Sequence, residues 1–261
     1  MKYICILDTE TIVEKQRVFD IGIIIADVKG NIVLEKQWFL KETFFKKMFY
    51  ETKRDLYIDR LHSPDYPATL VSTKEAFEEL ENIFKFFKIK EVYAYNARFD
   101  SRVIEKMANE LKLDNPLEDV DMECLWFWST QTIMLKSSFK KFAKRWNLLT
   151  PKGNYKTSAE VVYAYLVDDP DFVEEHTALE DCRIELEIYK ACKQQKKARV
   201  RGMASNPWLI PQEQEQIDKL PPQFRTMKIN LEGEMEKVAK LFAMLHKEIG
   251  IEVDVNLENW E

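Results

Sequence analysis

The chain has 261 residues, of which 46% are hydrophobic and 32% are charged, and its formal net charge is -6. This composition is typical of a globular protein with a full apolar core, and it excludes a chain that is mostly disordered. The net charge excludes a uniformly basic surface, so binding to nucleic acid would require local clusters of lysine and arginine.

The cysteines and the N-terminus indicate the cellular setting. The four cysteines form no CxxC pair and show no spacing typical of a zinc site, which favours a reducing environment. The N-terminal segment reaches the carboxylate of Asp8 too early for a signal peptide. No apolar run approaches the roughly 20 residues that cross a bilayer. We therefore expect a cytoplasmic protein that makes no membrane contact.

Three strands are predicted at the start of the chain, over residues 2–8, 18–28 and 32–40. The second and third are joined by Lys29-Gly30-Asn31, which is a turn signal. Three consecutive strands with short connections predict an antiparallel meander.

Helices and strands are predicted to alternate after the meander. The expected elements are a helix over 73–87, a strand over 91–95, a helix over 99–113, a fifth strand within 120–128, and helices over 138–148, 158–167 and 172–196. A meander followed by this alternation predicts an α/β fold with a mixed five-stranded sheet, three antiparallel strands then parallel strands, flanked by helices.

Two segments lie outside this predicted core. Residues 42–71 combine aromatic residues with lysines, a pattern that fits either buried aromatic packing or stacking of nucleobases. A Pro- and Gln-rich stretch then leads to an amphipathic helix over 232–249. We expect a main domain over residues 1–200 and, over residues 201–261, a linker and a C-terminal helical extension.

One local basic cluster stands out against the acidic average. Six lysines and arginines and no acidic residue occur between Lys190 and Arg201. The cluster fits either a contact surface for phosphates or the solvated end of a helix.

Candidate metal ligands follow two of the predicted strands. Asp8 and Glu10 are two positions apart at the end of the first strand, so their side chains share one face. Asp100 follows the strand at 91–95 and begins a helix, where ligands commonly lie in open α/β sheets. Carboxylates gathered in this way are the ligands that Mg²⁺ and Mn²⁺ prefer.

A third segment adds His176 and Asp181 near the start of a helix. A five-residue offset places two side chains about 140° apart on a regular helix, so they cannot share a helix face. Both can reach one site if His176 lies in the preceding loop. Imidazole at such a position can accept a proton from water.

The three segments together resemble the DEDDh branch of the DnaQ-like, proofreading-type 3′–5′ exonucleases of the ribonuclease H-like superfamily. The matching motifs are Leu7-Asp8-Thr9-Glu10-Thr11, Asn96-Ala97-Arg98-Phe99-Asp100 and His176-Thr177-Ala178-Leu179-Glu180-Asp181. Their order, spacing and strand-helix context agree with the family, and the resemblance covers about residues 1 to 195.

The resemblance implies a two-metal-ion hydrolase. Asp8, Glu10 and Asp181 would bind the first Mg²⁺ or Mn²⁺, Asp8 would bind the second, Asp100 would act on the second through water, and His176 would be the general base. The products would be nucleoside 5′-monophosphates. The residues implied to contact the terminal nucleotide are Thr9, Thr11, Ile12, Asn96 and Phe99.

The sequence departs from the common family pattern at two positions. Ile12-Val13 replaces a frequent Thr-Gly pair, and Tyr95 replaces a frequent His before the second motif. Neither change removes a metal ligand, although both concern the contacts with the terminal nucleotide. Four further acids near the motifs are interpreted as structural or electrostatic accessories: Asp20, Asp121, Glu123 and Glu180.

The resemblance predicts hydrolysis of single-stranded DNA from its 3′ end, in proofreading, repair or replication, alone or with a polymerase or other replication protein. Two alternatives remain open. One is trimming of RNA 3′ ends, as by ribonuclease T or oligoribonuclease, because a sequence does not show how the pocket treats a 2′-hydroxyl. The other is a catalytically inactive nuclease fold that serves as a binding module.

Overall fold

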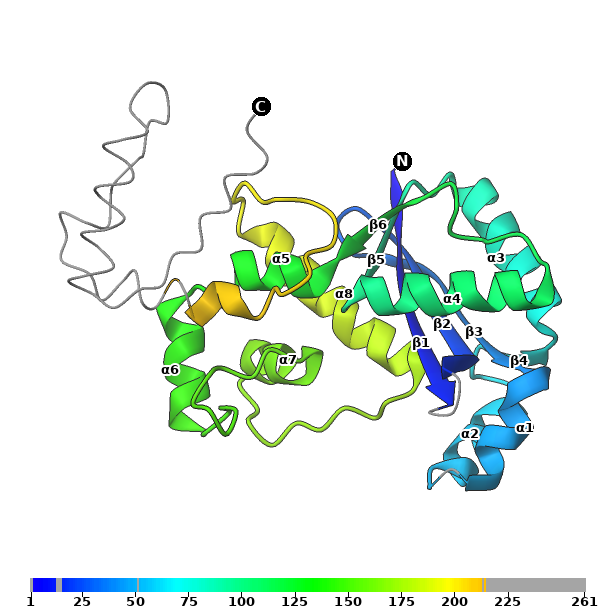
Figure 1. The fold of residues 1–261 in the computed structure, drawn as a ribbon, viewed down its shortest axis with the longest axis horizontal. Helices are drawn as coiled ribbons and strands as arrows, with labels where there is room; N and C mark the ends of the chain where they lie inside the picture. The colour runs from blue at the N-terminus through cyan, green and yellow to red at the C-terminus, as the bar shows by residue number, and fades with distance from the viewer. Residues whose placement is uncertain (1, 13–15, 51, 213, 215–261) are drawn as a thin grey trace, which may run out of the picture. The chain divides into compact units, whose positions relative to one another are not determined.

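The computed structural model of the chain describes residues 2–12, 16–50, 52–212 and 214 (Figure 1). The helix predicted at 232–249 lies outside these residues. Within the described ranges, no helix combines the length and apolar character that crossing a bilayer requires.

A six-stranded mixed sheet forms the centre of the fold. Its strands are β1 (Tyr3–Ile12), β2 (Arg17–Asp27), β3 (Ile32–Leu40), β4 (Ala68–Val71), β5 (Glu91–Ala94) and β6 (Asp121–Cys124), in the order β4-β3-β2-β1-β5-β6. β1, β2 and β3 are antiparallel, β5 and β6 run parallel to β1, and β4 runs parallel to β3. The expected fold class is confirmed, with β4 as an additional edge strand.

Helices cover both faces of the sheet. They are α1 (Lys41–Tyr50), α2 (Arg54–His62), α3 (Thr73–Phe87), α4 (Ala97–Leu111), α5 (Leu125–Gln131), α6 (Ser137–Arg145), α7 (Ala159–Val167) and α8 (Ala178–Gln194). α3 and α4 pack on one face, and α8 with its neighbours packs on the other (Figure 1). Two boundaries differ from the predictions: helix α5 replaces the second half of the strand expected over 120–128, and α8 begins at Ala178 instead of residue 172.

Strand β1 distributes its side chains between the two faces. Ile4 and Ile6 belong to the apolar core under α8, whereas Cys5 and Leu7 belong to the core under α3 and α4. By the same alternation, Asp8 and Glu10 face α8 while Thr9 faces α4. The end of β1 therefore presents polar groups to both helices.

Helix α8 approaches β2 closely at Gly22. A β-carbon at this position would lie 2.4 Å from the carbonyl carbon of Ala178 and 2.5 Å from the amide nitrogen of Leu179. The same helix end is held by Asp20, whose Oδ2 accepts a hydrogen bond from the Ala178 N–H at 3.1 Å. This contact fixes the position of the first turn of α8, which carries Asp181.

Replacing Gly22 with alanine is expected to destabilise the protein by about 1–3 kcal/mol, because backbone atoms of α8 would have to move to admit the methyl group. Urea denaturation followed by circular dichroism would measure the loss. An unchanged unfolding midpoint would contradict the close contact between α8 and β2.

The aromatic segment 42–71 contributes mainly to packing. Phe44 and Tyr57 are buried with Phe19 and Phe39 in a separate apolar cluster beneath α1 and α2. These two side chains are therefore core residues, and base stacking by them is excluded. Phe45 is the exposed aromatic residue among the described side chains of this segment.

The basic cluster between Lys190 and Arg201 is partly used within the protein. Arg199 and Arg201 form ion pairs with the buried carboxylate of Glu123 at 2.7 Å and 2.6 Å. The Gly202 N–H donates to the same carboxylate at 3.0 Å. These contacts attach the segment after α8 to strand β6, so both arginines have a structural role.

Candidate active site

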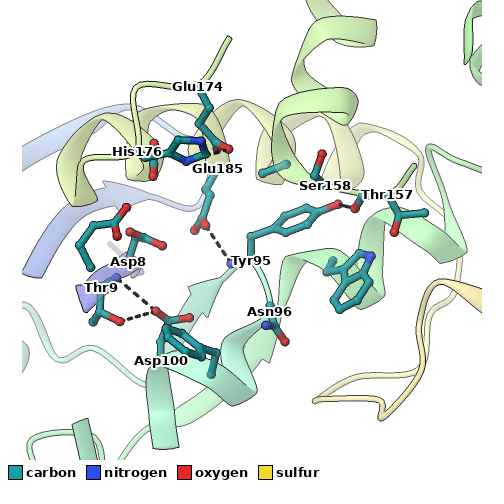
Figure 2. A pocket seen from close by; sticks show the side chains of 15 residues that line it. Asp8, Thr9, Tyr95, Asn96, Asp100, Thr157, Ser158, Glu174, His176 and Glu185 are labelled. Atoms are coloured by element: carbon teal, nitrogen blue, oxygen red, sulfur yellow. Dashed lines mark hydrogen bonds and ion pairs between the residues drawn. The ribbon is translucent and has the colours of Figure 1, made fainter. Parts of the chain in front are cut away.

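A pocket of about 460 Å³ opens at the carboxyl ends of β1 and β5 (Figure 2). The parallel strands β1 and β5 end at the same edge of the sheet, at the point where the strand order reverses direction. Residues of all three motifs line the pocket, namely Asp8, Thr9, Glu10, Asn96, Phe99, Asp100, His176 and Asp181. The structure therefore brings together segments that are more than 160 residues apart in sequence.

Two predicted substrate contacts lie elsewhere. Thr11 and Ile12 are not among the residues that line this pocket, and Ile12 packs against the apolar cluster of Phe19 and Phe39. Their contact with a terminal nucleotide stays a prediction.

Thr9 connects the first motif to the second. Its backbone N–H and its hydroxyl donate to Oδ1 of Asp100 at 3.1 Å and 2.8 Å. Burial raises the pKa of Asp100 to about 7, although the bonds from Thr9 oppose the rise. Burial, together with the neighbouring carboxylates of Asp100 and Glu185, also raises the pKa of Asp8 well above its ordinary range.

Asn96 adopts a left-handed backbone conformation between β5 and α4, with φ of 64°. Asparagine tolerates this conformation better than most residues, so part of its sequence signal is conformational. The turn directs the first turn of α4, with Asp100, towards the end of β1.

Glu10, His176 and Asp181 form a compact group of potential metal ligands. One ligand atom from each lies within 4.8 Å of the others. His176 lies in the loop before α8 and Asp181 in its first turn, as the five-residue offset requires. His176, from the loop, and Asp181, from the helix, thus lie beside one another and beside Glu10.

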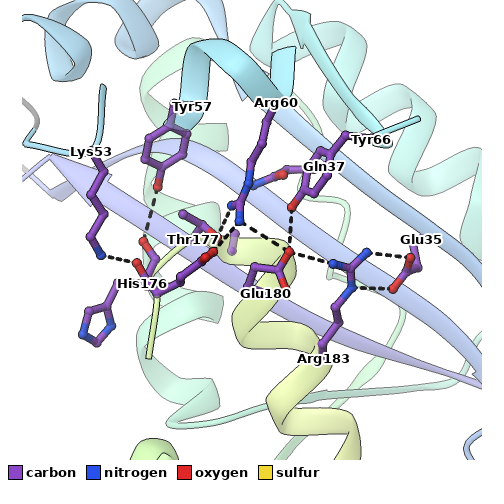
Figure 3. A network of polar contacts seen from close by, with 12 residues as sticks. Glu35, Gln37, Lys53, Tyr57, Arg60, Tyr66, His176, Thr177, Glu180 and Arg183 are labelled. Carbon is purple, nitrogen blue, oxygen red and sulfur yellow. Dashed lines mark hydrogen bonds and ion pairs between the residues drawn. The ribbon is translucent and has the colours of Figure 1, made fainter. Parts of the chain in front are cut away.

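Helix α2 holds the loop that carries His176 (Figure 3). Lys53 donates to the carbonyl of Glu175, Tyr57 donates to the carbonyl of His176 at 3.4 Å, and Arg60 donates to the hydroxyl of Thr177. His176 has a left-handed backbone with φ of 53°, a conformation that persists when surrounding contacts impose it. The segment 42–71 thus contributes to the site by positioning this loop.

Glu174 lies beside the histidine in the same loop. Its Oε2 is 3.7 Å from Nδ1 of His176, whose side chain is 60% exposed. Burial, followed by the nearby charge of Glu160, raises the pKa of Glu174 to about 7. Glu174 is therefore placed to orient the imidazole ring.

The donor set fits a hard divalent cation. Oδ1 of Asp181 is buried and has no hydrogen-bond partner among the described residues, and the side chain is 7% exposed. Burial, followed by the charges of Glu174 and Glu10, raises the pKa of Asp181 to about 9. Crowded carboxylates with an unpartnered oxygen are the arrangement that a bound cation stabilises.

Aromatic rings form one wall of the pocket and continue beyond it. Tyr95 and Trp126 line the pocket, with ring centroids 6.3 Å apart and planes 21° apart. Trp126 stacks in turn on Trp208, at 5.5 Å and 23°, and Trp208 is 39% exposed. The hydroxyl of Tyr95 donates to the carbonyl of Thr157 at 2.5 Å, which fixes the first ring.

Several pocket residues were not predicted from the sequence: Trp126, Thr157, Ser158, Ala159, Glu174 and Glu185. Glu185 had a usable signal, because it is four residues after Asp181 and so shares its helix face. Trp126 and Glu174 lie in segments whose direction depends on tertiary packing, and no local pattern marks them.

The comparisons with known proteins place the fold among exonucleases. No protein-family model and no curated protein matches the sequence. Exonuclease I, in a structure described as suggesting how processivity is achieved, matches with a TM-score of 0.51 and 14% identity, over 75% of this chain and 42% of its own. The zinc-bound complex of E. coli ExoI with single-stranded DNA matches with a TM-score of 0.50 and 13% identity, over 75% and 41%.

A third match is exonuclease X in complex with 5′-overhanging duplex DNA, with a TM-score of 0.40 and 15% identity, over 80% of this chain and 99% of its own. The chain spans about two fifths of the length of the exonuclease I chains. At these identities, the matches to exonuclease I show a shared fold.

Proposed function

We propose that this protein is a divalent-metal-dependent 3′–5′ exonuclease that releases nucleoside 5′-monophosphates from single-stranded DNA. The observation that carries the proposal is the pocket at the ends of β1 and β5, where Asp8, Glu10, Asp100 and Asp181 meet His176. A shared fold with exonuclease I supports the proposal independently of the motifs.

The carboxylates would hold the cations. Asp8, Glu10 and Asp181 would bind one Mg²⁺ or Mn²⁺, and Asp8 would bind the second, with Asp100 acting through water. Bound cations of this kind lower the pKa of water and stabilise the leaving oxygen of a phosphodiester.

The chain's own groups would orient the reaction. His176, in a loop fixed by α2 and beside Glu174, would accept a proton from the attacking water. Phe99 and Asn96 line the same pocket and would contact the terminal nucleotide. A polymerase or other replication partner and a cytoplasmic location stay predictions.

The aromatic wall favours a single strand as substrate. Every unpaired base presents a flat face, and stacking on aromatic side chains is the common means of holding single strands without sequence preference. The outer face of Trp208 extends the stack of Tyr95 and Trp126 away from the pocket. A base upstream of the cleaved nucleotide would continue this stack.

Replacing Trp208 with alanine is expected to lower the affinity for a short single-stranded oligonucleotide about tenfold, because one base loses its stacking partner. Fluorescence anisotropy with labelled oligothymidine, in EDTA to prevent cleavage, would measure this. Trp146, which is 45% exposed and lies at the end of α6, provides the matched control. Equal affinities for the two variants would contradict the stacking role.

A product assay on end-labelled strands tests the function itself. Single-stranded DNA and RNA, labelled at either the 3′ or the 5′ end, would be incubated with Mg²⁺ or Mn²⁺. The expected result is immediate release of a 3′-labelled mononucleotide and stepwise shortening of 5′-labelled DNA. Preferential cleavage of RNA would favour 3′-end trimming, and inactivity on every strand would favour a binding module.

A further inference from the structure

Besides the four motif carboxylates and Glu174, the pocket is lined by Glu185, which none of the three motifs includes. Glu185 lies on α8 four residues after Asp181, and its side chain is 2% exposed. Figure 2 shows it extending towards the ends of β1 and β5. Its Oε1 accepts a hydrogen bond from the backbone N–H of Tyr95 at 3.0 Å.

The second carboxylate oxygen of Glu185 lacks a partner within the part of the chain that the structure describes. Oε2 is buried and has no hydrogen-bond partner among the described residues. No ion pair links Glu185 to a lysine, arginine or histidine of the described chain. A buried, unpartnered oxygen in a native site requires a physical reason, and a bound ion is one of the few available.

The neighbours of Glu185 make a purely structural role costly. Burial, followed by the charge of Asp100, raises the pKa of Glu185 well above its ordinary range, and Glu185 in turn raises the pKa of Asp8. A neutral glutamine could accept the same hydrogen bond from Tyr95 without adding negative charge to this cluster. Without a cation this buried carboxyl group must therefore take up a proton, because the described side chains provide no positive charge beside it.

Glu123 shows how the same protein satisfies a buried glutamate that has a structural role. Glu123 is 4% exposed, and its two oxygens are paired with Arg199 and Arg201. Its pKa is lowered, because these hydrogen bonds and charges outweigh the effect of burial. Glu185 is as little exposed as Glu123, but no arginine or lysine of the described residues pairs with it.

We propose that Glu185 is a fifth carboxylate of the divalent-cation site, and that its Oε2 would help Asp8 and Asp100 to hold a cation. This inference rests on the proposed function, because it requires that the pocket binds Mg²⁺ or Mn²⁺. Glu185 would raise the affinity of the site for cations, while its bond to Tyr95 would tie the cation to the turn that begins α4.

The test compares cation binding by the full-length protein with that of two isosteric variants. Glu185→Gln keeps an acceptor for the Tyr95 N–H and removes the charge. Thermal unfolding would be followed across a titration with Mn²⁺ alone, and Mn²⁺ binding would be measured separately by electron paramagnetic resonance. The matched control is Glu123→Gln, a buried glutamate outside the pocket.

We expect Glu185→Gln to melt at the same or a higher temperature than the parent protein in EDTA, because glutamine needs no proton to be buried among these carboxyl groups. The Mn²⁺ concentration for half-maximal stabilisation should rise about tenfold or more. Glu123→Gln should melt at a lower temperature in EDTA and keep the parental Mn²⁺ dependence.

Each outcome decides between the proposals. A parental Mn²⁺ dependence in Glu185→Gln overturns the role of Glu185 and leaves the exonuclease proposal intact. If the parent protein shows no Mn²⁺ response, the cation site and the proposed function both fail. Should Glu185→Gln not fold, Glu185→Asp, which keeps the charge but withdraws it by one methylene, must show weakened Mn²⁺ binding, and parental binding overturns the proposal.

Discussion

Replacing Asp8 with asparagine is expected to lower the rate of DNA cleavage at least about a thousandfold while leaving the fold intact. Asp8 is the side chain on which the electrostatic effects of Asp100, Glu185, Asp181 and Glu10 converge. The substitution retains the shape of the side chain and removes the charge that a cation requires. Release of mononucleotide from 3′-labelled single-stranded DNA in Mn²⁺ would measure the loss.

The stability of the Asp8→Asn variant and its affinity for single-stranded DNA must be measured together with its rate of DNA cleavage. The variant should melt at no lower temperature than the parent protein in EDTA, because one of several crowded carboxylates becomes neutral. Asp121→Asn, an exposed aspartate at the start of β6, is the control and should retain full activity. Parental activity in Asp8→Asn would place the chemistry outside this pocket.

The same variant separates an enzyme from a binding module. A catalytically inactive fold that only binds strands would show no cleavage to lose, and its affinity in EDTA would be the same with either side chain. Loss of cleavage with retained binding of a single strand is the outcome that the carboxylate arrangement predicts.

The parts of the fold that depend on local signals were predictable from the sequence. Helix α3 has the predicted bounds, Thr73–Phe87, because Ser72 and Glu75 form a capping box that fixes its start. The alternation of β1 places Asp8 and Glu10 on one face, and the five-residue offset allows His176 and Asp181 to share a site only if His176 precedes the helix, although the predicted helix over 172–196 included it. These inferences need only the periods of a strand and a helix.

Elements that depend on distant partners were not predictable in this way. Strand β4 has only four residues and is stabilised by parallel pairing with β3. The sequence of residues 68–71 alone does not predict this pairing. α8 begins at Ala178 because contacts from α2 and Asp20 determine the path of the preceding loop. In the sequence, Glu185 is indistinguishable from any helical glutamate; its place in the pocket becomes visible only through the hydrogen bond from the backbone N–H of Tyr95, in the turn after β5.

Raising the pH is expected to destabilise the protein in the absence of metal. Burial raises the pKa of Asp20 from 3.8 to about 7, so between these values the folded chain holds a proton that the unfolded chain has released. Stability is therefore greatest at low pH within this window and falls as the pH rises. For Asp20 alone the rise in pKa corresponds to about 4 kcal/mol. Asp100 and Glu174, each with a pKa of about 7, act in the same direction, and Asp181 extends the fall towards pH 9.

Cations should reverse this fall, since a divalent ion replaces the protons that the carboxylates otherwise hold. Urea denaturation at intervals from pH 5 to about 8, in EDTA and in Mn²⁺, would measure both effects; the stabilisation by Mn²⁺ should grow with pH.

The Asp20→Asn variant measures how much of this pH dependence comes from Asp20, which holds the start of α8. Its oxygen can still accept the hydrogen bond from the Ala178 N–H, and its amide can donate to Oε1 of Gln37 once the Gln37 amide turns over, because Nε2 of Gln37 faces Asp20 in the parent protein. This variant should lose only the part of the pH dependence in EDTA that Asp20 contributes, and it should keep its response to Mn²⁺, because Asp20 holds α8 in place and does not line the pocket. A pH-independent stability in EDTA for the parent protein would contradict the crowding of carboxylates on which the cation site depends.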